Sequence, residues 1–330
     1  MTRTIALTSP RPRYQQTARR PGWAELPAAV RAVIEARVGG MAEPAPSAGG
    51  GFTPGFAARV AGRGGRWFVK AASIVEVPFV AESYLAEARI NPLLPEAVPA
   101  PRLRWVEQVE DWAVVGFDLV EGHMPRQPWR SDELAAALDA HAAAAEALDP
   151  APEAFAALGL GTLAEQDGEF GFWRGLAGRA TGADRLPGYV PHAWIEPLAR
   201  LEADWSTATA GSCVLHHDLR ADNILIEPTG TAVICDWNWA VLGPAWLDLT
   251  VLLATAFADG HDASALLARH PSASGADPEQ IDVALAGLAG LFVDRGGQPE
   301  VPTSPALRGH QRFSAEVVLR WLAERRGWAM

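Results

Sequence analysis

Cysteine is scarce in this sequence, since only Cys213 and Cys235 occur among 330 residues. Both lie in apolar, strand-like stretches, so we expect two buried free thiols and no disulfide. A structural metal site needs four suitably spaced ligands, which two isolated cysteines do not supply. The cysteine content therefore excludes a disulfide scaffold and a cysteine-based metal centre.

Long apolar runs are also missing. The longest, from Val283 to Val293, reaches about half the length of a membrane span and is interrupted by glycines. Residues 1–20 carry several arginines without the apolar segment of a secretory signal, and their polar character predicts a frayed tail. We expect a soluble, cytoplasmic protein that does not bind membranes.

Positive charge is in short supply, because 28 Lys and Arg residues stand against 39 Asp and Glu residues and give a formal net charge of -11. Such a protein repels nucleic acids and anionic membranes. The charge suits a cationic substrate, although an acidic composition also serves solubility alone. Apolar residues make up 49% of the chain, which is enough for a sizeable core and excludes disorder throughout.

Lysine occurs only once, as Lys70, at the end of the strand-like segment 67–70. Its compact ammonium is suited to bind phosphate groups, and a solvated surface lysine is the alternative. The P-loop pattern Gly-x-x-x-x-Gly-Lys-Ser/Thr is absent, as is a strict Gly-x-Gly-x-x-Gly. The glycines of 49–55, among them Gly51, form either a phosphate-binding loop or a plain flexible linker.

Apolar periodicity and turn residues divide the chain into three regions. Residues 1–40 form a tail and a helix, residues 41–122 combine strands with one helix, and residues 123–330 are mainly helical. This succession predicts an α+β protein. The expected helices are 23–38, 81–91, 132–148, 194–205, 246–257, 262–270, 281–293 and 307–326, and the expected strands are 59–61, 66–71, 102–106, 112–120, 213–215, 224–226 and 232–235.

The segment 214–249 carries the most specific pattern, His216-x-Asp218-x-x-x-x-Asn223, followed by two apolar strands and Asp236. Phosphoryl transfer needs a carboxylate that orients the attacking hydroxyl and accepts its proton. It also needs an amide oxygen and a second carboxylate that hold Mg²⁺ on the phosphates. A tight loop beside a strand end lets Asp218, Asn223 and Asp236 converge on one cleft.

These residues resemble the catalytic and metal-binding loops of the aminoglycoside phosphotransferase family, which are relatives of the protein kinases. The family pattern is His-Gly-Asp-Leu-x-x-x-Asn-Ile-Leu, then Ile-Asp-Trp, then Gly-(Asp)-Pro-x-x-Asp-Leu. The matching stretches here are 216–225, 235–237 and 243–249. The resemblance implies a protein-kinase-like bilobal fold, with a small β-rich N-terminal lobe at 41–122 and a larger, mainly helical C-terminal lobe at 123–330.

The resemblance also implies a role for each residue of this segment. Asp218 would be the catalytic base, and Asn223 and Asp236 would be the Mg²⁺ ligands. His216 would support the catalytic loop, and Asp248 would brace that loop without taking part in the chemistry.

In the first lobe, the resemblance makes Lys70 and Glu87 the ion pair of the third kinase strand and the C helix. Glu82 is the rival partner, but it lies on a different helical face, so only one of the two glutamates should point inward. The stretch 117–122 is similar to the kinase hinge, which implies that Asp118 and Val120 bind the nucleotide base through their backbone. An ordinary connection between the lobes also fits this stretch.

Two residues depart from the family pattern. His217 stands where the family usually has glycine, and Arg220 replaces a residue that is often histidine. Arg220 either contacts a phosphate or substrate, which would make it part of the catalytic group, or pairs with an acidic neighbour such as Asp222. Neither change removes a residue that the chemistry needs.

The acceptor is expected to bind between the catalytic loop and the helices of the C-terminal lobe. Acidic residues at 165–169 and 259–262 are candidates for binding a cationic acceptor, with solvated loop charges as the alternative. Trp237, Trp239 and Trp246 flank the active loop, where they either stack on a sugar or base or pack in the core.

Together these features predict an ATP- or GTP-dependent, Mg²⁺-requiring O-phosphotransferase. It would move the γ-phosphate to a hydroxyl of a small molecule such as an aminoglycoside or other antibiotic, a sugar or a nucleoside. A metal-dependent phosphohydrolase is the first alternative, and it needs a further histidine and aspartate besides His216, His217 and Asp218. A catalytically silent binding protein with the kinase fold is the second. The sequence leaves the acceptor and the oligomeric state open.

Overall fold

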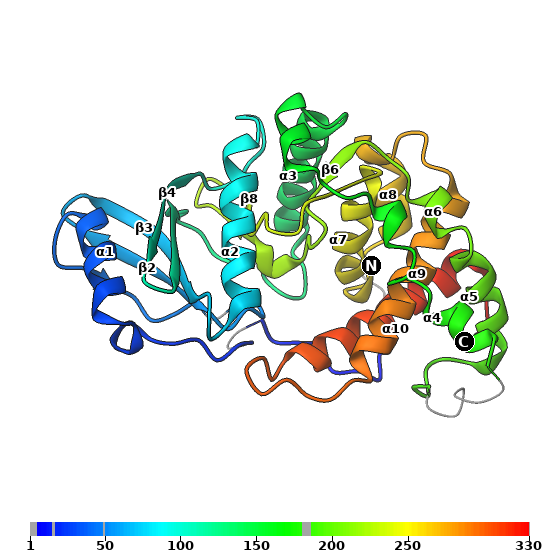
Figure 1. Ribbon diagram of the computed structural model, residues 1–330. Coiled ribbons are helices and arrows are strands. Elements are labelled where there is room, and N and C mark those ends of the chain that lie inside the picture. Colours follow the sequence, from blue (N-terminus) through cyan, green and yellow to red (C-terminus); the bar gives the residue numbers. More distant parts are fainter. Residues whose placement is uncertain (1–4, 15–16, 49, 180–185, 330) are drawn as a thin grey trace.

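The computed structural model describes residues 5–14, 17–48, 50–179 and 186–329. Its first part is built on a five-stranded antiparallel sheet with the strand order β1-β2-β3-β5-β4. Figure 1 shows this sheet and helices α1 and α2 at one end of the molecule. The elements of this part are β1 (Glu43–Pro44), β2 (Phe56–Gly62), β3 (Gly65–Ser73), β4 (Leu103–Val109), β5 (Trp112–Asp118), α1 (Ala28–Val38) and α2 (Pro78–Ile90).

The alternation of side chains along β3 places α1 and α2 on opposite faces of the sheet. Val69 and Ala71 pack in one apolar cluster with residues of α1, whereas Ala72 packs in a second cluster with residues of α2. Successive side chains of a strand point to opposite faces. Lys70, which lies between Val69 and Ala71, is therefore directed to the face that α2 covers.

The rest of the described chain is mainly helical and holds the largest apolar core. Helices α9 and α10 pack against each other along their length (Figure 1). The helices are α3 (Ser131–Leu148), α4 (Phe172–Ala177), α5 (Ile195–Glu202), α6 (Trp205–Ala208), α7 (Trp246–Ala258), α8 (Ala263–Arg269), α9 (Pro278–Gly296) and α10 (Leu307–Arg326). Two short antiparallel pairs join β6 (Cys213–Leu215) to β9 (Val241–Gly243) and β7 (Ile224–Ile226) to β8 (Ala232–Ile234).

Single turns of 3₁₀ helix connect these elements. They are η1 (Trp23–Glu25), η2 (Asn91–Leu93), η3 (Glu153–Leu158), η4 (Leu163–Gln166), η6 (His192–Trp194), η7 (Ala221–Asn223) and η8 (Pro271–Ala273). Within the described residues, no helix combines the length and the apolar character that crossing a bilayer requires.

The predicted fold class is confirmed, because a β-rich part precedes a mainly helical part in a kinase-like arrangement. Helix α2 begins at Pro78, three residues before the predicted start, since proline is well accommodated in the first turn of a helix. Strand β9 escaped prediction because its three residues gain their strand character only by pairing with β6. Cys213 and Cys235 are free thiols, as expected, but only Cys213 is buried, whereas Cys235 is half-buried.

The prediction that residues 1–20 fray is wrong for the described part, 5–14 and 17–20, which we call the N-terminal strap. The backbone N–H groups of Thr8 and Ser9 donate to the Glu316 carboxylate at 2.8 and 2.7 Å. Glu316 on α10 is fully buried, so these donors satisfy a carboxylate that would otherwise be costly to bury. Figure 1 accordingly shows the dark-blue strap beside α10 of the second part.

A buried histidine pair should make the stability of this fold sensitive to acid. His141 on α3 packs against His270 with ring centroids 5.1 Å apart, and burial lowers the pKa of His141 to about 3. The unfolded chain binds this proton more tightly than the folded one. The free energy of unfolding should therefore fall by about 1.4 kcal/mol per pH unit, for this ring alone, as the pH drops from about 6.5 towards 3.

Urea titrations at several pH values check this expectation. His141→Gln should flatten the acid limb of the stability profile, because glutamine has no proton to gain. His123→Gln, at a half-exposed histidine, should keep the wild-type slope. An unchanged slope in the His141 variant would contradict the expectation.

Candidate active site

Lys70 lies at the centre of a buried ion cluster between the sheet and α2. Its Nζ is 2.5 Å from Oε2 of Glu87 and also contacts the Asp236 carboxylate. Lys70 and Glu87 are only 5% and 2% exposed. Glu82 points to the surface and pairs with Arg89, so the structure pairs Lys70 with Glu87 and not with the rival glutamate.

The two carboxylates of this cluster differ in their electrostatics. Burial raises the pKa of Glu87 to about 7 against the opposing effect of Lys70. Burial also disfavours ionised Asp236, but the attraction of Lys70 outweighs it, so the pKa of Asp236 lies below its ordinary value. The single ammonium therefore stabilises chiefly the negative charge of Asp236.

Asp248 and His216 hold the loop that follows β6. The Asp248 carboxylate, at the start of α7, accepts the backbone N–H groups of His216 at 2.6 Å and His217 at 2.9 Å. The His216 ring accepts the N–H of Asp218 on Nδ1 at 3.2 Å, so Nε2 carries the proton and donates to the Cys235 carbonyl at 2.7 Å. These contacts fix the backbone of the loop, as the resemblance implied.

Unusual backbone conformations cluster at the same place. Among the described residues, three non-glycine residues have positive φ, and two of them are His217 at 63° and Asp236 at 64°. This left-handed region is costly for most side chains but accessible to histidine and aspartate. Such conformations persist only where the surroundings enforce them, and they are typical of functional sites.

Asp218 and Asn223 are joined directly. The Asn223 amide donates to the backbone carbonyl of Asp218 at 2.8 Å and to its Oδ2 at 3.1 Å. Burial raises the pKa of Asp218, with Arg220 opposing this effect. A carboxylate with a raised pKa is a stronger proton acceptor near neutral pH.

Arg220 pairs with two carboxylates at once. Its guanidinium binds Asp222 through two contacts of 3.0 and 3.1 Å and also contacts Asp218. The pairing with Asp222 matches the structural alternative for Arg220, and the contact with Asp218 was not anticipated. Arg220 therefore fixes the orientation of the Asp218 carboxylate.

The pairing of β7 with β8 brings Asn223 next to Asp236. The register matches Ile224 with Ile234, and the N–H of Cys235 donates to the Asn223 carbonyl at 2.8 Å. Asp236 is the next residue along the chain. The antiparallel ladder thus links the Asp218 loop to the Lys70 cluster.

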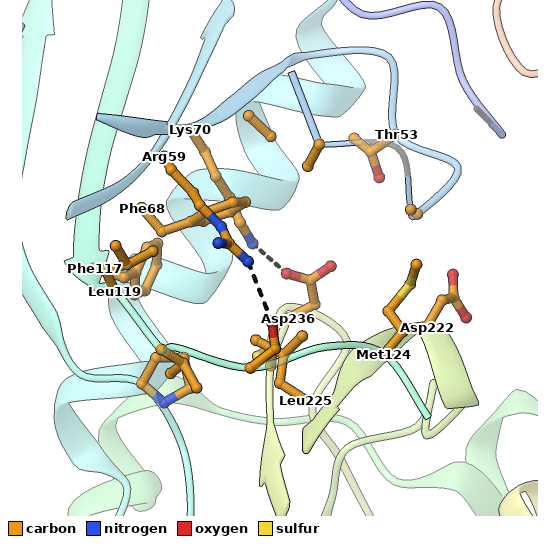
Figure 2. Close-up of a pocket in the computed structure, with 18 of the residues that line it drawn as sticks. Thr53, Arg59, Phe68, Lys70, Phe117, Leu119, Met124, Asp222, Leu225 and Asp236 are labelled. Carbon is orange, nitrogen blue, oxygen red and sulfur yellow. Dashed lines mark hydrogen bonds and ion pairs between the residues drawn. The ribbon is translucent and has the colours of Figure 1, made fainter. Parts of the chain in front are cut away.

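A cavity of about 580 Å³ opens beside these groups. Figure 2 shows Lys70 directed at Asp236, with Phe117 and Leu119 at the left of the view and Leu225 below Asp236. Phe68 also lines the cavity. The predicted nucleotide-binding residues lie along its wall, and they are Lys70, Glu87, Gly51, Asp118 and Val120. Gly49, the first glycine of the predicted loop, lies outside the described residues.

Asp118 presents little free charge to this cavity. Its carboxylate pairs with Arg104 through contacts of 2.6 and 2.8 Å. The Asp118 side chain is therefore occupied by Arg104, and the backbone binding of a nucleotide base at this stretch stays a prediction. Arg59 on β2 holds the following turn by donating to the Gly122 carbonyl at 3.3 Å (Figure 2).

The predicted acceptor residues divide into structural and exposed ones. Trp237 and Trp246 are buried in the core, whereas Trp239 is 41% exposed and packs on the exposed Phe79 with ring centroids 5.5 Å apart. Asp259 is not a solvated loop charge, because its buried carboxylate binds Arg11. The other acidic candidates also have partners within this chain. Asp262 caps α8 and Glu165 caps η4. Asp167 pairs with Arg174, and Glu169 pairs with Arg295.

Several residues that line the cavity were not identified from the sequence. Arg20 reaches it from the N-terminal strap, Tyr84 from α2, and Asn238 from the segment after Asp236. Only Tyr84 had a local signal, because it lies one helical turn before Glu87 on α2. Arg20 is brought there by tertiary contacts alone.

A family model described as the phosphotransferase enzyme family (APH) matches residues 48–282, which is more than half of the chain. That range includes the Lys70 cluster, the Asp218 loop and Asp236. Among curated proteins, none is significantly similar to this chain in sequence.

Solved structures with the same fold cover nearly the whole chain. Choline kinase LicA from Streptococcus pneumoniae is 13% identical, with a TM-score of 0.56, over 89% of this chain and 99% of that one. Aminoglycoside phosphotransferase APH(4)-Ia, solved with ADP and hygromycin B, is 14% identical, with a TM-score of 0.55, over 88% and 98%. Spectinomycin phosphotransferase APH(9)-Ia, solved with ADP and spectinomycin, is 11% identical, with a TM-score of 0.55, over 86% and 93%.

At these identities the structural neighbours establish the fold alone, and the family model adds the membership. The chain therefore belongs to the phosphotransferase enzyme family (APH) and is a small-molecule phosphotransferase with a protein-kinase-like bilobal fold.

Proposed function

We propose that the protein transfers the γ-phosphate of ATP to a hydroxyl of a small molecule. In this proposal Asp218 is the base, Lys70 binds the donor phosphates, and Asn223 and Asp236 hold Mg²⁺. The contact of Lys70 with Asp236 carries the proposal, because it joins a phosphate-binding cation to a metal-binding carboxylate at the wall of one cavity.

The donor base belongs in the apolar part of the cavity, between the two lobes at 41–122 and 123–330. Phe68, Phe117, Leu119 and Leu225 supply apolar surface for a planar ring. Asp118 and Val120 line the same wall and offer their backbone groups to the ring edge. ATP is preferred to GTP as the donor because the neighbours solved with nucleotides contain ADP, AMP-PNP or AMP.

The chemistry of the donor set suits Mg²⁺. Both hydrogen bonds of the Asn223 side chain among the described residues use its nitrogen, which leaves the amide oxygen for a cation. Asp236 uses one oxygen for Lys70 and retains the other. An amide oxygen with a carboxylate oxygen is the hard set that Mg²⁺ prefers, and the bound ion would neutralise charge on the phosphates.

Asp218 is suited to orient the acceptor hydroxyl and to take its proton. Asn223 and Arg220 hold its carboxylate, and its raised pKa increases its basicity. Arg220 remains fixed to Asp222 while it does so, and acts as a positioning residue. His216 and Asp248 hold the backbone of this loop in place through their hydrogen bonds.

The metal-dependent phosphohydrolase gains no support from the side chains. Among the described residues, no group of three His, Cys, Asp or Glu side chains is arranged to hold a metal ion. His217 donates its backbone N–H to Asp248, and its ring is buried, which lowers its pKa. The side chains of this loop therefore favour a phosphotransferase over a phosphohydrolase.

The proposal is tested by measuring ADP release with ATP, Mg²⁺ and a panel of hydroxyl-bearing acceptors. Hygromycin B, spectinomycin and choline are tested first, because they are the compounds named for the structural neighbours. Aminoglycosides, sugars and nucleosides follow. We expect one class to give ADP together with a phosphorylated product detected by mass spectrometry, and chelation of Mg²⁺ by EDTA should stop both.

The other readings give different results in the same assay. Release of orthophosphate from small phosphomonoesters, without ATP, would indicate a phosphohydrolase. ATP binding without ADP release for any acceptor would indicate a silent binding protein with this fold.

A further inference from the structure

The N-terminal strap is fastened to the second lobe at several points along its length. Thr8 and Ser9 bind Glu316 on α10, and Arg11 binds the buried Asp259 at the end of α7. Further along, the N–H of Arg19 donates to the Thr303 carbonyl at 2.9 Å. The strap thus crosses to the first lobe at a fixed place, immediately before α1.

At this crossing the strap forms hydrogen bonds with the glycine-rich loop, residues 50–55. Arg20 donates to the carbonyls of Gly50 at 2.8 Å and Gly55 at 3.0 Å, and the Thr17 hydroxyl donates to the Gly51 carbonyl at 2.5 Å. Gly51 has a φ of 75°, and a Cβ there would lie 3.0 Å from the Arg20 guanidinium. Glycine at this position therefore permits both the turn and the close approach of Arg20.

Arg20 also faces the cavity with donor capacity left over. Its guanidinium lines the cavity and interacts with the Tyr84 hydroxyl. The contacts with the loop carbonyls leave at least one of its five N–H donors unused. A cation with an unused donor beside a cavity suits a ligand that brings acceptor oxygens.

The charge balance of the cavity points to the same kind of ligand. Lys70 already neutralises charge on two carboxylates, Glu87 and Asp236, so the cluster has no net positive charge to offer. Arg20 lines the same cavity as this cluster and adds a second cation there. A polyphosphate needs a further cation here besides a metal ion.

We infer that Arg20 is a donor-binding residue, which holds the glycine-rich loop over the cavity and gives its free guanidinium donor to the phosphates of the nucleotide. This inference rests on the proposed function and adds to it a residue that lies outside the two lobes. The donor site is then completed by the N-terminal strap, and Arg20 distinguishes nucleotides by their phosphates and not by their base.

Equilibrium binding of ATP and adenosine to Arg20→Met tests the inference. Loss of charge-assisted hydrogen bonds to phosphate should weaken ATP binding about tenfold to a hundredfold. Adenosine binding should change less than about twofold, because the base and ribose keep their contacts. Arg19→Met is the matched control: it removes the neighbouring exposed arginine, whose fixed contact is made by the backbone, and should leave both affinities unchanged.

Three results would overturn the inference. Unchanged ATP affinity in Arg20→Met is the first, and equal weakening of ATP and adenosine is the second, since it would mean that Arg20 only shapes the cavity. Should Arg20→Met fail to fold, Arg20→Gln takes its place as a neutral polar replacement, and an ATP-specific loss of less than about threefold is the third. Absence of ATP binding by the wild-type protein would instead overturn the proposed function, and this inference with it.

Discussion

Replacement of Asp218 by asparagine is expected to lower kcat by about a hundredfold to ten-thousandfold while nucleotide affinity stays within about threefold of wild type. A positioned general base contributes about 10²–10⁴ to the rate, and asparagine cannot accept the hydroxyl proton. The side chain keeps its size, so the hydrogen bond from Asn223 can persist. Arg220 keeps its two contacts with Asp222 and does not become an unpaired buried charge.

Steady-state kinetics with the acceptor found in the ADP-release assay, together with nucleotide titration, check this expectation. Asp139→Asn is the control, because it makes the same chemical change on the exposed face of α3. Near-normal turnover by Asp218→Asn would remove Asp218 from the role of base. Parallel loss of ATP affinity would instead assign it to donor binding.

Replacement of Lys70 by methionine is expected to damage both the fold and the donor site. Methionine has a similar length but no charge, so Glu87 and Asp236 would face each other without their shared cation. Removing one partner of a buried ion pair costs about 3–5 kcal/mol. We expect a fall of that order in the free energy of unfolding, and ATP binding reduced by at least about a hundredfold.

The double variant Lys70→Met/Glu87→Gln separates the two effects. It removes the more deeply buried carboxylate together with the ammonium, so most of the lost stability should return in urea titrations. Asp236 tolerates this change because its side chain is 38% exposed. ATP affinity should stay low, since no cation has been restored. Recovery of ATP binding along with stability would show that Lys70 serves the fold alone.

The segment 214–249 was readable from the sequence because its chemistry and its geometry are local. The spacing from Asp218 to Asn223 spans one loop, and the next two apolar runs pair as adjacent antiparallel strands. The neighbouring position of Asp236 follows from that short hairpin. Lys70 was readable for a similar reason, because alternation along one strand decides which face its side chain takes.

The N-terminal strap could not be predicted, because nothing in its own residues specifies its partners. Thr8 and Glu316 are separated by 308 positions in the sequence. The sequence of a polar tail with several arginines does not indicate whether the tail is solvated or bound to buried carboxylates on distant helices. The place of Arg20 and the pairing of Asp259 with Arg11 were missed in the same way, since each residue acquires its environment only when the lobes and the strap have assembled.

The tryptophans show a further limit. Trp237 and Trp239 lie two residues apart in one short segment, yet one is buried and the other is 41% exposed. The segment has no regular secondary structure, so no periodicity assigns its side chains to the core or to the solvent. The identity of the acceptor depends on surfaces of this kind.

Lys70 is the only lysine in the chain, and it is 5% exposed within a cluster of two carboxylates. Every modification that uses a lysine amine, whether acetylation, ubiquitin attachment or a chemical crosslinker, therefore has a single side-chain target. That target lines the cavity beside Asp236, so the outer surface offers no lysine to such reactions. Reagents that modify the lysines of most proteins at many surface positions would modify only the Lys70 side chain in this protein.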